Sequence, residues 1–174
     1  MKFEPKQQAP LSGTELVAGA APVIDFWRWA YSDLRDNLAR SVFAEFLVGL
    51  AVSGISGVGE SWDDDDLLTS TGIKVEVKSA AYLQSWPTEK LSTIGFGGLR
   101  SRAWTPEQGL DDEPAFHADV YVFALLACTD HAELNPLAAD QWKFWVASRQ
   151  AVAATDVRRL ALSHVQTIAS GPLK

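Results

Sequence analysis

A nearly uninterrupted apolar run, ADVYVFALLA at residues 118–127, is the feature that most limits how this chain can fold. A run of this kind is typical of a β-strand in the centre of a sheet, with both of its faces buried. Such a strand needs other elements packed on both sides. Helical patterns precede and follow it, so the sequence predicts an α/β sandwich in which helices flank a central mixed sheet.

Two segments upstream of this strand have different helical patterns. Residues 23–38 carry apolar residues at helical spacing with polar residues opposite, which predicts a surface helix with one buried face. The segment SVFAEFLVGLAV, residues 41–52, is apolar on every side and predicts a helix buried all round. Its only charge is Glu45. Because an unpaired buried carboxylate is costly, Glu45 either reaches the surface, pairs with Arg40, or points into a site at the inner face of the helix.

A β-hairpin is predicted between residues 66 and 80. The segment IKVEVKSA, residues 73–80, alternates apolar and polar residues, so Glu76 and Lys78 share one face of a strand. Thr71-Gly72 is a turn signal, and residues 66–69 form the other arm. The hairpin brings an acidic residue of the first arm, Asp66, near Glu76 on the second.

Weaker patterns complete the expected fold. Residues 92–98 and 141–147 predict two further strands, and Ser163 is the expected N-cap of a closing helix that ends at Ala169. Residues 1–20 mix Pro, Gln, Gly and Ala without period and are expected to be a flexible N-terminal arm. Residues 21–174 are long enough to form one domain with its own core.

Composition excludes several classes of protein. The formal net charge of −7 argues against tight non-specific DNA binding. Residues 63–66 and 111–113 hold seven of the 22 acidic residues, which leaves 15 to balance the 15 lysines and arginines. A single cysteine excludes an intramolecular disulfide and fits a reducing compartment. The longest apolar stretch, residues 42–58, is too short and too interrupted to span a bilayer, so a cytoplasmic protein without membrane contact is expected.

The hairpin residues have the chemistry that phosphodiester hydrolysis needs. Carboxylate-bound Mg²⁺ can neutralise phosphoryl oxygens, generate a hydroxide and assist the leaving alkoxide. Two carboxylates suffice, because Mg²⁺ keeps several of its waters. Asp66 and Glu76 are the candidate ligands, with Asp64 and Asp65 as alternatives to Asp66. The Lys78 ammonium can orient or polarise the attacking water and stabilise negative charge.

Asp66 followed by Glu76-Val77-Lys78 at the end of an alternating strand resembles the PD-(D/E)xK signature of restriction-endonuclease-like nucleases. The wider string also resembles small, uncharacterised bacterial members, and the resemblance covers residues 23–147. Asp65 stands where the signature has its Pro. The resemblance implies a restriction-endonuclease-like α/β/α sandwich in which Asp66 and Glu76 bind Mg²⁺ and Lys78 assists the nucleophilic water. Glu45 resembles the acidic residue that many members carry on the preceding helix, where it completes or supports the metal site.

The implied activity is that of a Mg²⁺-dependent DNA endonuclease in restriction, repair or DNA processing, with Mn²⁺ as a substitute. Gln84 resembles a polar residue that some relatives place near the active site or the DNA backbone. Ser79 and Arg40 are further candidate phosphate contacts, and Trp86 either stacks on bases or fills a core edge. Many relatives act as homodimers. The alternative is a non-catalytic DNA- or protein-binding module on the same fold.

Overall fold

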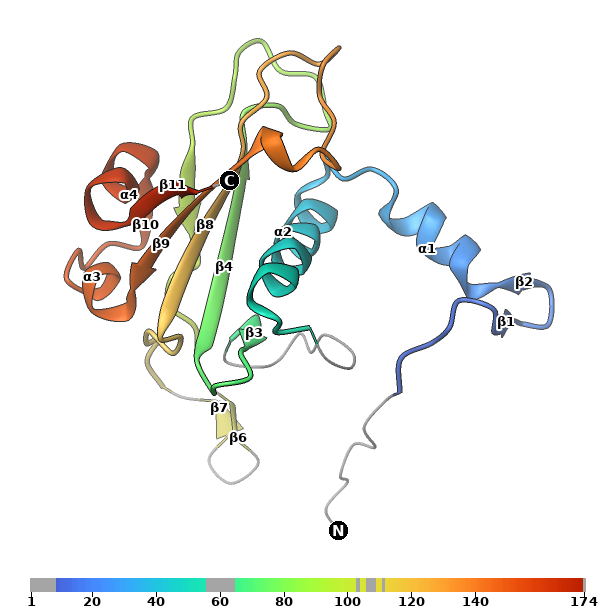
Figure 1. The fold of residues 1–174 in the computed structure, drawn as a ribbon, viewed down its shortest axis with the longest axis horizontal. Helices are drawn as coiled ribbons and strands as arrows, with labels where there is room; N and C mark the ends of the chain where they lie inside the picture. The colour runs from blue at the N-terminus through green and yellow to red at the C-terminus, as the bar shows by residue number, and fades with distance from the viewer. Residues whose placement is uncertain (1–8, 56–64, 103, 106–108, 111, 174) are drawn as a thin grey trace.

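The computed structural model describes residues 9–55, 65–102, 104–105, 109–110 and 112–173. Its centre is a five-stranded mixed sheet in the order β11-β9-β8-β4-β3 (Figure 1). β4 and β8 are parallel, and the other neighbours are antiparallel. The five strands are β3 (Leu67–Leu68), β4 (Lys74–Ala81), β8 (Val120–Leu126), β9 (Trp142–Ser148) and β11 (Ser170–Leu173). The prediction of a mixed α/β protein is confirmed, and the apolar run forms its middle strand.

Helices cover both faces of the sheet. α2 (Asn37–Val52) lies on one face, whereas α3 (Arg149–Ala153) and α4 (Leu162–Ile168) lie on the other (Figure 1). β8 alternates between the two cores. Tyr121, Phe123 and Leu125 pack with residues of α3 and α4, and Val122, Ala124 and Leu126 pack with residues of α2. This two-sided burial is the reason that β8 has no polar side.

Several shorter elements surround this core. β5 (Gly95–Gly97) pairs with β10 (Arg159–Ala161) in a small separate sheet. Two more two-stranded sheets and a 3₁₀ helix also lie outside the five-stranded sheet. Their bounds are β1 (Leu16–Val17), β2 (Ala21–Pro22), β6 (Trp104–Thr105), β7 (Gly109–Leu110) and η1 (Ala139–Gln141). β1 lies within the arm expected at residues 1–20, and β2 follows directly after it.

The helix predicted over residues 23–38 is wrong in its length and in its burial. α1 (Val23–Tyr31) ends early, and α2 begins at Asn37. Between them Asp36 acts as an N-cap, because its carboxylate accepts hydrogen bonds from the backbone N–H groups of Leu38 and Ala39. α1 extends away from the sheet (Figure 1), and only its first residue, Val23, is buried.

The prediction that residues 41–52 form a helix is confirmed, but the prediction that it is buried all round is wrong. One face packs on β4 through Ala44 and Val48. The opposite face presents an apolar stripe of four residues spaced by four, which are 47–66% exposed: Leu38, Val42, Phe46 and Leu50. We call this surface the α2 stripe. An apolar sequence alone does not distinguish a core helix from one with an exposed apolar face.

Two smaller predictions also need correction. Only Gly95–Gly97 of the strand expected at residues 92–98 is extended, and it pairs outside the main sheet. The N-cap of α4 is Ala161 rather than Ser163, and it makes no side-chain capping bond. Among the described residues, no helix has the length and apolar character needed to cross a membrane.

Candidate functional site

One edge of β4 is open, and the candidate site lies along it. β3 pairs only with Val75 and Lys74, so beyond Val75 this edge has no strand partner within the described residues. The backbone N–H of Val77 donates instead to Oδ2 of Asp66 at 2.7 Å, and the backbone N–H of Asp66 donates to the carbonyl of Val75 at 3.1 Å. The predicted hairpin is thus confirmed, and it holds the Asp66 carboxylate against the middle of β4.

Glu76 and Lys78 lie on the same face of β4, as the alternation predicted. They form a salt bridge, and their side chains are only 14% and 22% exposed. The Lys78 ammonium also lies beside the residue that follows β5: a Cβ atom built on Gly98 would be 3.8 Å from Nζ. The Glu76 carboxylate and the Lys78 ammonium are therefore held together on one face of β4.

Glu45 approaches this group from α2. Its pKa is raised to about 7, mainly by burial and then by the negative charge of Asp66. Glu76 raises it further, whereas Lys78 opposes the shift. The expected alternative pairing with Arg40 is not found, because the Arg40 guanidinium donates to the carbonyl of Arg35 and to Oδ1 of Asn37.

The other two carboxylates respond in the same direction. Burial raises the pKa of Asp66 and of Glu76, and the Asp66 charge raises that of Glu76 further. Lys78 lowers both, and the Val77 hydrogen bond also lowers that of Asp66. Three acidic side chains and one ammonium thus share one electrostatic environment, in which bound cations or protons would relieve repulsion.

The donors fit Mg²⁺ in chemical type, although they do not form a closed cage. No group of three or more His, Cys, Asp or Glu side chains is arranged to hold a metal ion within the part of the chain that the structure describes. Asp66 and Glu76 supply hard oxygen ligands, and a site of two carboxylates completed by water suits Mg²⁺. Asp65 is engaged by Lys74 at 3.1 Å, and Asp64 lies outside the described residues.

The three candidate substrate-binding residues lie on a single cleft. Arg40, Ser79 and Gln84 all line a cavity of about 530 Å³. Ser79 also hydrogen-bonds across it to Ser41 of α2, with the two Oγ atoms 3.0 Å apart. Arg159 of β10 is a further lining residue. Sequence reasoning missed it because no local pattern relates it to β4, and only the β5–β10 pairing brings it there.

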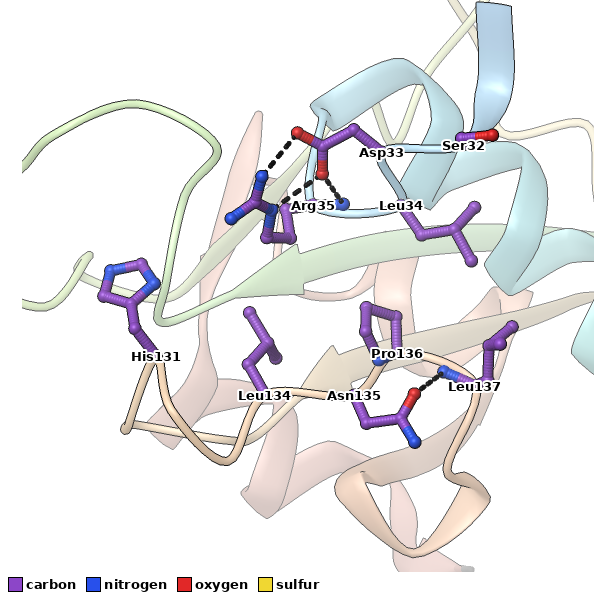
Figure 2. A pocket seen from close by; sticks show the side chains of 9 residues that line it. All are labelled: Ser32, Asp33, Leu34, Arg35, His131, Leu134, Asn135, Pro136 and Leu137. Carbon is purple, nitrogen blue, oxygen red and sulfur yellow. Dashed lines mark hydrogen bonds and ion pairs between the residues drawn. The ribbon is translucent and has the colours of Figure 1, made fainter. Parts of the chain in front are cut away.

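A second cavity, of about 490 Å³, contains none of the predicted site residues. Figure 2 shows it between the α1–α2 connection and the loop that precedes η1. Its Asp33 and Arg35 side chains are hydrogen-bonded to each other. Leu34, Leu134 and Pro136 contribute apolar surface. None of the predicted catalytic residues lines this cavity, so the candidate site remains the edge of β4.

Comparisons of this chain with family models, curated proteins and solved structures found no match.

Proposed function

We propose that this protein is a Mg²⁺-dependent nuclease that hydrolyses DNA phosphodiester bonds at Asp66, Glu76 and Lys78. The observation that carries the proposal is the hydrogen bond from Val77 to Asp66. It joins the two arms of the hairpin so that Asp66 raises the pKa of both Glu76 and Glu45. A purely structural surface hairpin has no reason to gather three repelling carboxylates around one lysine.

Each residue has a role that its position supports. Asp66 and Glu76 would hold the ion, and Glu45 would support them from α2. When bound, Mg²⁺ supplies Lewis acidity and neutralises charge on the phosphate. Lys78 is a hydrogen-bond donor beside the carboxylates, where it would orient the attacking water and stabilise charge that develops on the phosphoryl oxygens.

The arrangement of the sheet also favours the restriction-endonuclease-like architecture that the sequence resembles. Its features here are a mixed sheet, helices on both faces, and an acidic site where a β-hairpin meets the open edge of a central strand. We therefore propose a restriction-endonuclease-like fold for this chain.

Cleavage of supercoiled plasmid tests the activity. We expect wild-type protein to nick or linearise the DNA with Mg²⁺ or Mn²⁺ and to be inactive in a chelator. Lys78→Ala should abolish cleavage. Lys143→Ala, which removes an exposed ammonium from β9, is the matched control and should leave it unchanged. Equal cleavage by wild type and Lys78→Ala would exclude the proposed centre.

A non-catalytic binding module is the second candidate, and the net charge of −7 favours it. Such a module would bind DNA or a protein without consuming it, and binding would be unaffected by Lys78→Ala. If wild type and Lys78→Ala both bind DNA and neither cleaves it, this alternative is correct.

We also propose that two copies of the chain associate through the α2 stripe. Monomeric proteins rarely leave large contiguous apolar surfaces uncovered, and a standard interface needs roughly 800 Å² from each partner. The four stripe residues, together with Phe26 and the 84% exposed Trp29 on α1, are large apolar side chains that such an interface would bury. A twofold arrangement would let the α1 of each copy cover the stripe of the other.

A further inference from the structure

The open edge of β4 continues past the acidic site into the polar cleft. Ser79, one residue beyond Lys78, lines the cleft, and so do Ala80 and Ala81 at the end of the strand. α2 forms one wall through Arg40, and β5 and β10 contribute the other through Gly95 and Arg159. A strand bound at the acidic site would therefore run directly into this cavity.

Two buried side chains on the cleft have polar atoms without hydrogen-bond partners among the described residues. Arg40 is 4% exposed and its Nε–H donates to nothing, although both terminal nitrogens are hydrogen-bonded. Gln84 is 9% exposed and its Oε1 accepts nothing. The amide orientation of Gln84 is fixed, because its Nε2 donates to the carbonyl of Ala81 at 3.1 Å and to Ser92 Oγ at 2.8 Å. Buried polar groups are costly to leave unsatisfied, so each of these atoms calls for a partner from outside the described residues.

The charge of the cleft is opposite to that of the whole chain. Arg40 and Arg159 line it, and none of its lining residues is Asp or Glu. The Arg159 side chain lies over Gly95, where an added Cβ atom would be 2.5 Å from Nε. Glycine at position 95 thus leaves the space in which this guanidinium reaches the cleft. Two guanidinium groups on a lining that holds no acidic side chain suit a phosphate.

The unpaired acceptor narrows the class of ligand. Phosphodiester oxygens only accept hydrogen bonds, so they satisfy Arg40 and Arg159 but leave Oε1 of Gln84 without a donor. A base edge supplies N–H donors, and only an unpaired base presents its whole Watson–Crick edge, which the partner strand occupies in a duplex. Trp86, 47% exposed, also lines the cleft and offers a stacking surface for a base.

We propose that this cleft binds one unpaired nucleotide of a nucleic-acid strand, with its phosphate on Arg40 and Arg159 and its base against Gln84 and Trp86. The protein would then prefer single-stranded or frayed substrates to intact duplex. The binding site stands on its own geometry. The further step, that the strand bound here is the strand cut beside Lys78, rests on the proposed function.

Fluorescence anisotropy in a chelator measures this binding without cleavage. The probes are one labelled single-stranded DNA, the RNA of the same sequence, and the blunt DNA duplex. Wild type should bind the single strands at least about tenfold more tightly than the duplex, and a difference between DNA and RNA would show which sugar the cleft accepts. Arg159→Ala and Trp86→Ala should each weaken single-strand binding by roughly tenfold, the scale of one lost stacking or phosphate contact.

Arg158→Ala is the matched control, because Arg158 is the adjacent exposed arginine and does not line the cleft. It should bind like wild type, and thermal melts should show all variants folded. Equal affinity for duplex and single strand, or equal effects of Arg158→Ala and Arg159→Ala, would overturn the inference. Arg159-dependent binding without any Mg²⁺-dependent cleavage would support the cleft and refute the nuclease. Cleavage that requires Lys78 but is unchanged in Arg159→Ala would support the nuclease and refute the proposed role of the cleft.

Discussion

The carboxylate of Asp66 accepts a hydrogen bond from the backbone of Val77, at 2.7 Å, across eleven positions of sequence. This contact takes the place of a strand partner at the open edge of β4. Its acceptor is a charged side chain, so the contact fixes the fold of the hairpin and the position of a candidate metal ligand at once. Substitutions of Asp66 can therefore test its structural role and its proposed role as a metal ligand separately.

Asp66→Asn keeps a side-chain oxygen that can accept from Val77, whereas Asp66→Ala removes the acceptor. We expect Asp66→Ala to lower the free energy of unfolding by about 1–3 kcal/mol relative to Asp66→Asn, the scale of a hydrogen bond to a charged or buried group. Urea denaturation measures this difference. Both variants should lack nuclease activity, so an active Asp66→Asn protein would contradict the assignment of Asp66 as a ligand.

The stability of the metal-free protein should fall as pH rises. The pKa of folded Glu45, about 7, lies above its ordinary value of 4.5, so the native state binds this proton more tightly than the unfolded state does. The stabilising contribution is complete below pH 4.5 and is lost as pH rises through 7.

Glu45→Gln tests this pH dependence, because the variant keeps the size of the side chain and cannot ionise. Thermal melts in a chelator between pH 4.5 and 8 should show a smaller decline for Glu45→Gln than for wild type. Parallel curves for the two proteins would show that Glu45 is not the group responsible.

The positive charge of Lys78 should lower the pKa of the three neighbouring carboxyl groups. Its charge lowers the pKa of Glu45, Asp66 and Glu76, so Lys78→Met should move all three titrations to higher pH. Carboxyl-carbon NMR of the metal-free protein can follow them. Lys143→Met serves as the control and should shift none of them. An unchanged Glu76 titration in Lys78→Met would mean that the salt bridge does not persist in solution.

The α2 stripe should govern self-association. Sedimentation or light scattering of wild type should report a dimer at micromolar concentration, and Phe46→Asp should give a monomer. Leu68→Asp, at an exposed apolar position on β3 that is 55% accessible and is not part of the α2 stripe, should remain dimeric. A wild-type monomer at high concentration, or a dimer that tolerates Phe46→Asp, would exclude this interface.

Short-range patterns predicted the hairpin well. Strict alternation placed Glu76 and Lys78 on one face, and the turn signal at residues 71–72 placed Asp66 opposite. Gly72 adopts φ of +81°, a conformation that favours glycine, which explains why the turn could be located from sequence. The β8 strand was equally predictable from the sequence, because a strand buried on both faces must be apolar throughout.

Features that depend on long-range packing or on side-chain hydrogen bonds could not be predicted from the sequence. The break between α1 and α2 depends on local hydrogen bonds of Asp33 and Asp36, which apolar periodicity does not register. The exposure of the α2 stripe depends on which elements cover it. Arg159 reaches the cleft only through the pairing of β10 with β5, more than 60 residues apart in the chain.

Calorimetric titration of Mn²⁺ into wild type, Asp66→Asn and Glu76→Gln tests most directly whether the gathered carboxylates form a metal centre. The expected result is saturable binding to the wild type that is lost in both variants, with the folded state of each verified by circular dichroism. Wild-type protein that takes up no ion, or uptake that persists in Asp66→Asn and Glu76→Gln, would contradict the account.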